Sequence, residues 1–70
     1  MPEIKALAEK IAQIRHGKKE TQAVFAHNCG ISEEELSLLE REKTDPKLST
    51  LQNIAAYTGN TVSDLLDTKE

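Results

Sequence analysis

The residues whose side chains most often ligate metals or act as nucleophiles are few in this chain: Cys29, His16 and His27. Their spacing matches no metal-ligand pattern, and no serine, aspartate and histidine follow one another in a plausible catalytic order. The sequence also has no glycine-rich phosphate loop. We therefore expect no metal, no cofactor and no enzymatic activity, and we expect Cys29 to be a small core residue.

The side chains that remain for chemistry are charged. Residues 33–35 are three consecutive glutamates, and basic residues precede and follow them along the chain: Lys18, Lys19, Arg41, Lys43 and Lys47. The net charge of −3 by itself argues against nucleic-acid binding, because neutralised phosphates usually supply most of the affinity. The local distribution of charge can outweigh the net charge, so both a nucleic acid and a protein remain possible partners.

Length and composition indicate one small globular domain over residues 1–70. The chain has 70 residues, 37% hydrophobic and 30% charged, with one Phe and one Tyr, so its core must be aliphatic. A single cysteine excludes an internal disulfide and suits the reducing cytoplasm. No apolar run approaches the roughly 20 residues that span a bilayer, and no signal peptide is visible. We expect a cytoplasmic protein without a membrane segment.

Helical periodicity runs through almost every segment between the glycines and prolines, and no alternating strand pattern occurs. Thr21 is a good N-cap, and the patterns S-x-x-E at Ser32 and T-x-x-D at Thr61 are typical of capping boxes. Gly30 is expected to end a helix. The sequence therefore predicts an all-α fold with five short helices, at about residues 3–16, 21–29, 32–42, 47–58 and 61–67.

Two charged residues lie on the inner faces of these helices. Arg15 falls in the middle of the apolar stripe of the first helix, and Glu40 lies at the edge of the inner face of the third. A buried charge without a partner costs several kcal/mol, so we expect the two side chains to form a bidentate ion pair. The alternative is that both extend to water. The remaining inward positions of the last four helices are apolar: Phe25, Ala26, Cys29, Leu36, Leu39, Leu48, Leu51, Ile54, Ala55, Val62, Leu65 and Leu66.

The segment TQAVFAHNCGISEEELSLLEREKTDP (residues 21–46) resembles the Cro/C1-type (XRE) helix-turn-helix family. The family's typical pattern is T-Q-x-x-x-A-x-x-x-G-[IV]-S-x-x-x-[IL]-S-x-x-E-x-G-x-x-x-P. The flanking segments IAQIRHGKKE and LSTLQNIAAYTGNTVSDLL are similar to the family's first helix and to its C-terminal helices. The resemblance runs from about Ile4 to Leu66 without insertions, and it implies a compact five-helix lambda-repressor-like domain.

The resemblance also implies a function and a site. Members of the family are sequence-specific regulators of transcription, and the second helix of their helix-turn-helix, here about residues 32–42, enters the major groove of double-stranded DNA. The positions that read bases correspond to Glu33, Glu34, Ser37 and Leu38. The family's phosphate-contacting glutamine corresponds to Gln22, and its core ion pair to Arg15 and Glu40. On this fold two loops overlie the DNA backbone, and they carry the five basic residues Lys18, Lys19, Arg41, Lys43 and Lys47.

One such module buries too little surface for tight specific binding, so the resemblance further implies a homodimer on a two-fold DNA site. By the same analogy, the expected dimer contact is the C-terminal helix around Leu65 and Leu66.

The base-reading positions depart from the family, which usually has Gln, Arg, Lys, Ser or Thr there. A glutamate can accept a hydrogen bond from the amino group of cytosine, and Leu38 can meet a thymine methyl group. Alternatively, Glu33 and Glu34 only complement the dipole of their helix. The competing hypothesis is therefore a helix-turn-helix fold that binds a basic protein partner through this acidic helix and binds DNA weakly or not at all.

Two further positions depart from the pattern. Glu42 replaces the glycine that usually ends the DNA-reading helix, so either Glu42 adopts a left-handed conformation or the helix ends differently. Asn60 replaces an apolar residue beneath the last helix. That end of the domain is therefore expected to be looser, or to be completed by a partner chain.

Overall fold

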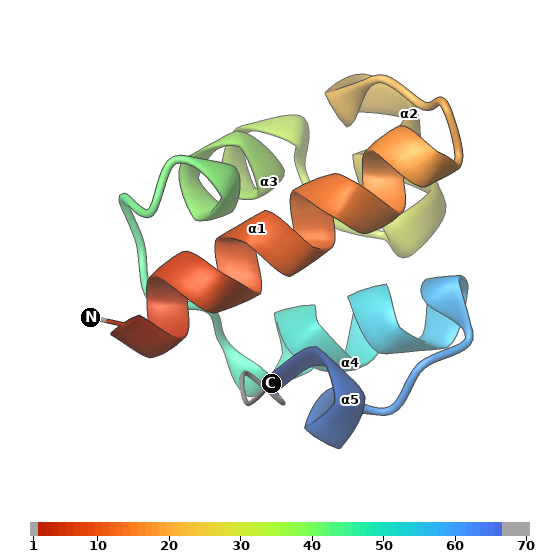
Figure 1. Ribbon diagram of the computed structural model, residues 1–70. Helices are drawn as coiled ribbons and strands as arrows, with labels where there is room; N and C mark the ends of the chain where they lie inside the picture. Colours follow the sequence, from red (N-terminus) through yellow and green to blue (C-terminus); the bar gives the residue numbers. More distant parts are fainter. Residues whose placement is uncertain (1, 67–70) are drawn as a thin grey trace.

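The computed structural model describes residues 2–66, and within them it contains five helices and no strand. The helices are α1 (Pro2–Gly17), α2 (Gln22–Cys29), α3 (Glu33–Glu40), α4 (Leu48–Thr58) and α5 (Val62–Leu66). In the view of Figure 1, α1 crosses the front of the molecule, with α2 and α3 above it and α4 and α5 below. The all-α class predicted from the sequence is confirmed. Residue 67, where the last helix was expected to end, lies outside the described residues.

Side chains cap three of these helices at the predicted residues. The hydroxyl of Thr21 accepts a hydrogen bond from the Val24 amide at 3.2 Å, and the hydroxyl of Ser32 accepts one from the Glu35 amide at 3.0 Å. At α5 the box is reciprocal: Thr61 accepts from the Asp64 amide at 3.0 Å, and Asp64 accepts from the Thr61 amide at 3.1 Å. These bonds satisfy amide groups that have no partner within their helix, and so they fix where each helix begins.

Left-handed residues follow the first four helices, and two of the four are not glycine. The positive φ angles are 59° at Lys19, 81° at Gly30, 61° at Glu42 and 77° at Gly59. After α3, the amide of Lys43 donates to the Leu38 carbonyl at 2.9 Å, which is the Schellman closure. Glu42 thus does what a glycine usually does. Of the two alternatives for this position, the left-handed conformation of Glu42 is therefore the one that the structure shows, and α3 itself ends at Glu40.

The core is aliphatic apart from Phe25, and every helix contributes to it. The buried apolar side chains are Leu7, Ala8, Ile11, Phe25, Ala26, Cys29, Leu36, Leu39, Leu51, Ile54, Ala55 and Leu65. The expectation that Leu48 and Leu66 face inward was wrong, because these side chains are 62% and 47% exposed. Asn60 is half-buried, and its side-chain amide donates to the Thr58 hydroxyl at 3.0 Å. Among residues 2–66, no helix is long and apolar enough to cross a membrane.

Candidate nucleic-acid interface

Arg15 and Glu40 form the bidentate ion pair that the apolar stripe of the first helix predicts. Nε of Arg15 lies 2.8 Å from Oε2 of Glu40, and Nη2 lies 2.9 Å from Oε1. Only 12% of the Arg15 side chain and 8% of the Glu40 side chain are exposed. The pair therefore fixes the C-terminal end of α3 on α1.

Gln22 connects a third helix, α2, to the Arg15–Glu40 ion pair. Its Nε2 donates to Oε1 of Glu40 at 2.9 Å, so the first residue of α2 is tied to the last residue of α3. Burial acts to raise the pKa of the Glu40 carboxyl, but the hydrogen bonds from Arg15 and Gln22 and the charge of Arg15 hold that pKa below its usual value. Glu40 is therefore ionised at neutral pH. Its carboxylate holds the start of α2 and the end of α3 together and fixes both to α1.

The three consecutive glutamates do not share one environment. Glu33 and Glu34 are exposed in the first turn of α3. Glu35 is half-buried, and its carboxylate accepts a hydrogen bond from the hydroxyl of Thr50 on α4. The capping box is thus formed only from the side of Ser32, because the Glu35 carboxylate reaches α4. Glu35 joins α3 to α4 and leaves Glu33 and Glu34 as the free carboxylates of this turn.

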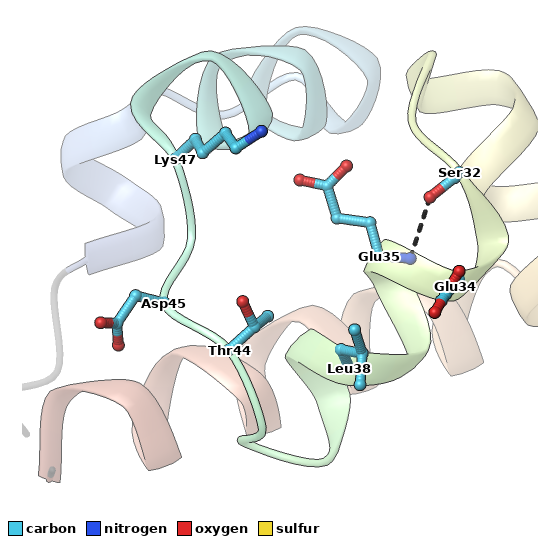
Figure 2. A pocket seen from close by; sticks show the side chains of 7 residues that line it. All are labelled: Ser32, Glu34, Glu35, Leu38, Thr44, Asp45 and Lys47. Carbon is cyan, nitrogen blue, oxygen red and sulfur yellow. Dashed lines mark hydrogen bonds between the residues drawn. The ribbon is translucent and has the colours of Figure 1, made fainter.

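Leu38 and Glu34 line a shallow hollow between α3 and the loop that leads to α4 (Figure 2). The hollow has a volume of about 220 Å³. The loop side is formed by Thr44, Asp45 and Lys47. The α3 side has Ser32 and Glu35 as well as Glu34 and Leu38. Ser37, the other predicted base-reading residue, is half-buried on α3 and does not line the hollow.

The predicted basic residues occupy two separate segments. Arg41, Lys43 and Lys47 are exposed after the end of α3, and Lys47 lines the hollow as the N-cap residue of α4. Lys18 and Lys19 are exposed in the loop between α1 and α2. The ammonium group of Lys18 lies 4.7 Å from the centre of the Tyr57 ring, a cation–π contact within the protein. The structure therefore brings Lys47, Glu34 and Leu38 together, whereas the ammonium group of Lys18 contacts Tyr57 of α4.

Sequence reasoning missed the contacts that hold the loop between α1 and α2. The Tyr57 hydroxyl donates to Oε2 of Glu20 at 2.6 Å and accepts from the Asn28 side chain at 3.0 Å. Nη1 of Arg15 donates to the Glu20 carbonyl at 3.0 Å. The hydrogen bond to Glu20 is the main cause that raises the pKa of Tyr57. Glu20 and Tyr57 are 37 positions apart, so no local sequence pattern predicts their contact.

Cys29 is buried and poorly suited to nucleophilic chemistry. Burial raises the pKa of its thiol to about 11; the charge of Glu20 acts in the same direction, and that of Lys18 opposes it. Within residues 2–66 no group of three His, Cys, Asp or Glu side chains is placed to hold a metal ion.

Two helices of similar length, α2 and α3, are joined by a tight turn at Gly30, and α3 presents an outer face with free carboxylates, so the molecule is a helix-turn-helix domain. A helix-turn-helix family model matches residues 11–65. The chain belongs to this family, in its Cro/C1-type (XRE) form.

A solved structure supports the same assignment. The crystal structure of the "hypothetical transcription factor NHTF from Neisseria" is similar to this chain with a TM-score of 0.82 and 28% sequence identity. The match covers 90% of this chain and 72% of the Neisseria chain. A comparison with curated proteins found no match.

Proposed function

We propose that this chain is a transcriptional regulator that binds double-stranded DNA in a sequence-specific way, with the outer face of α3 in the major groove. The observation that carries the proposal is the anchored helix-turn-helix. The Arg15–Glu40–Gln22 contacts hold α2 and α3 together, while the opposite face of α3 is left free. A rigid element of this kind suits groove recognition, because the placement of a few side chains decides which bases are read.

The proposal gives each predicted site residue a role in DNA binding. The base edges would be read by Glu33, Glu34, Ser37 and Leu38. Gln22 keeps a second Nε2 hydrogen for a phosphate, and it lies at the N-terminus of α2, where an anion is favoured. The remaining phosphate contacts would come from Lys18, Lys19, Arg41, Lys43 and Lys47. For Lys18, such a contact requires its ammonium to leave the Tyr57 ring.

The balance of charge on this face predicts a particular kind of affinity. The two free carboxylates of α3 repel phosphates, and the basic residues of the flanking segments attract them. If four or five cations meet phosphates, the logarithm of the binding constant falls against the logarithm of salt concentration with a slope of about −4. The free energy of association then comes mainly from the two flanking segments, and α3 supplies discrimination between bases.

We further propose that the regulator acts in the cytoplasm as a homodimer on a two-fold DNA site, because one domain of this size offers little interface. Leu65 is fully buried in the core, so it is not available to a second chain. Leu66, which follows it on α5, is 47% exposed. Of the two residues first considered for the dimer contact, Leu66 is therefore the one we retain.

One observation favours a second candidate function. Glu34 and Asp45 both line the hollow beside α3, and the chain carries a net charge of −3. A basic protein partner would find complementary charge there, in which case the helix-turn-helix would act as a protein interaction module.

A titration of fluorescent mixed-sequence duplex at low and at physiological salt separates the two functions. Binding at low salt that weakens with the expected slope supports the DNA-binding proposal. The double variant Glu33→Gln, Glu34→Gln should then bind mixed sequence more tightly, because two charges that repel phosphate are removed. The matched control is Glu9→Gln, an exposed carboxylate on α1. No binding at low salt would exclude the DNA-binding proposal and leave the interaction module.

A further inference from the structure

Glu34 and Leu38 lie one helical turn apart on α3 and face the same hollow (Figure 2). Side chains four positions apart on a helix are neighbours, so a carboxylate and an alkyl group stand side by side at this point. No hydrogen bond within residues 2–66 uses the Glu34 carboxylate. This neighbouring pair therefore presents a free acceptor next to an apolar group.

The other two polar side chains that α3 and its cap bring to the hollow each make a hydrogen bond within the protein. The Ser32 hydroxyl accepts from the Glu35 amide, and the Glu35 carboxylate accepts from the Thr50 hydroxyl. Glu34 differs from both because it is exposed and makes no such bond, so both of its carboxylate oxygens can accept from a ligand. A ligand that fits must present a donor to Glu34 and an apolar atom to Leu38.

Cytosine is the base whose major-groove edge presents a hydrogen-bond donor and no acceptor. Guanine shows two acceptors, adenine shows an acceptor beside a donor, and thymine shows an acceptor beside its methyl group. Cytosine shows the N4 amino donor, and its C5 carbon is the neighbouring atom of the same edge. A carboxylate is repelled by the acceptors of guanine and thymine, and also by the N7 acceptor that stands beside the amino group of adenine. Glu34 therefore selects cytosine both by attraction and by repulsion.

We propose, on the basis of the DNA-binding function above, that Glu34 and Leu38 read a single cytosine with a methyl group beside its amino group. Glu34 accepts a hydrogen bond from N4, and Leu38 packs against the methyl group. Two sources can supply that methyl: C5 of the same base, as 5-methylcytosine, or the thymine of the neighbouring base pair. Both give the same local chemistry, an amino donor adjacent to an apolar carbon.

The first experiment tests the donor half of the proposal. The full chain and its Glu34→Gln variant are each used to select sites from a randomised duplex pool. The wild-type protein should enrich a site with one invariant cytosine. In the variant the preference at that position should move to adenine, because a glutamine both donates and accepts and so matches adenine N6 and N7. The Glu9→Gln variant, with the same change of charge on α1, should keep the cytosine.

The second experiment tests the methyl half on the selected site. Four duplexes combine cytosine or 5-methylcytosine at the invariant position with thymine or uracil at the neighbouring positions. A methyl group at one of the two sources should tighten binding about fourfold, the effect of burying one methyl group. In the Leu38→Ala variant that gain should disappear. Circular dichroism in the helical region checks that Leu38→Ala is folded. The Glu34→Gln variant changes an exposed residue and tests the proposal without depending on the fold of Leu38→Ala.

The outcomes separate this inference from the function on which it rests. A protein that does not bind the pool at low salt overturns both. A protein that binds but selects no cytosine, or whose Glu34→Gln variant keeps the cytosine, overturns the inference and leaves the DNA-binding function standing. A methyl effect that Leu38→Ala leaves intact, or no methyl effect from either source, also overturns it.

Discussion

The guanidinium of Arg15 on α1 binds both carboxylate oxygens of Glu40 at the end of α3, at 2.8 Å and 2.9 Å. Because both side chains are largely buried, removing one leaves a buried charge without a partner. We predict that Glu40→Ala lowers the free energy of unfolding by about 3–5 kcal/mol. Urea unfolding followed by circular dichroism measures the loss.

A matched control separates the ion pair from a general effect of removing a glutamate. Glu9→Ala on the exposed side of α1 should change the free energy of unfolding by no more than about 0.5 kcal/mol. Glu40→Gln keeps an acceptor for Arg15 but loses the charge, so its loss of unfolding free energy should lie between those of Glu40→Ala and Glu9→Ala. An unchanged melting temperature in Glu40→Ala would show that the ion pair does not stabilise the fold.

The lowered pKa of Glu40 makes the stability of this domain dependent on pH. Burial acts to raise that pKa, and the hydrogen bonds and charge of Arg15, with Gln22, lower it overall, so folding favours the ionised carboxylate. The contribution is fully present above the unfolded-state pKa, about 4.3 for glutamate, and is lost as pH falls through the lower folded-state value.

Urea unfolding between pH 7 and pH 3 tests this sign. The difference in unfolding free energy between the wild type and Glu40→Gln should be constant near neutral pH. It should narrow as the pH falls below the unfolded-state value, because the wild type alone loses this contribution. A difference that stays the same, or grows, across the acid range would contradict the assignment of the ionised form to the folded state.

The features that the sequence predicted correctly are those set by local rules. Caps at Thr21, Ser32 and Thr61 follow from a hydroxyl placed before a helix, and the turn at Gly30 follows from a glycine placed after one. The Arg15–Glu40 contact was predictable for another reason. A charge inside an apolar stripe must have a partner, and the chain offered few charges on inner faces.

The rest depends on contacts between distant residues, which no spacing rule specifies. Thr50 and Glu35 are 15 positions apart, and Gln22 and Glu40 are 18 apart. Leu48 illustrates a related limit. Its helical period places it on the inner face of α4, but periodicity does not tell where the neighbouring helices end. More than half of this first residue of the helix therefore stays exposed. In the candidate site the residue types were predictable, and their partners and the hollow were not.

Glu42 carries backbone strain that a glycine would relieve. Its φ of 61° lies in the left-handed region, which costs a residue with a Cβ atom about 1–2 kcal/mol. Glycine avoids that cost but loses more conformational freedom on folding. We predict that Glu42→Gly raises the free energy of unfolding by about 0.5 kcal/mol. Glu42→Ala, measured by the same urea unfolding, should give no gain, and equal gains in both variants would point to charge instead of strain.

Cys29 reports on the opening of the core. The residue is 6% exposed and its thiol has a pKa of about 11. The folded protein therefore gives a reagent little access to the thiol and very little thiolate at neutral pH. We predict that a thiol reagent reacts with the folded protein roughly 10³-fold more slowly than with the protein in urea. The rate of labelling at pH 7 measures this ratio. Comparable rates in the two conditions would show that the C-terminal end of α2 is open in the native state.

The basic residues after α3 should determine how strongly DNA binding depends on salt. Lys43 and Lys47 are exposed on the segment that follows α3, and each phosphate contact adds about 0.9 to the magnitude of the salt slope. We predict that Lys43→Ala and Lys47→Ala each weaken binding to mixed-sequence duplex and reduce that magnitude by about 0.9. Fluorescence anisotropy at four salt concentrations gives the slope.

Two comparisons make that measurement specific to position. Lys5→Ala removes the same charge from the exposed surface of α1, so it should leave the slope nearly unchanged. Lys18→Ala should reduce the slope less than Lys43→Ala, because in the free protein the Lys18 ammonium is held over the Tyr57 ring and must give up that contact to meet a phosphate. Equal slopes in all four variants would mean that total charge, and not the placement of these lysines beside α3, drives association.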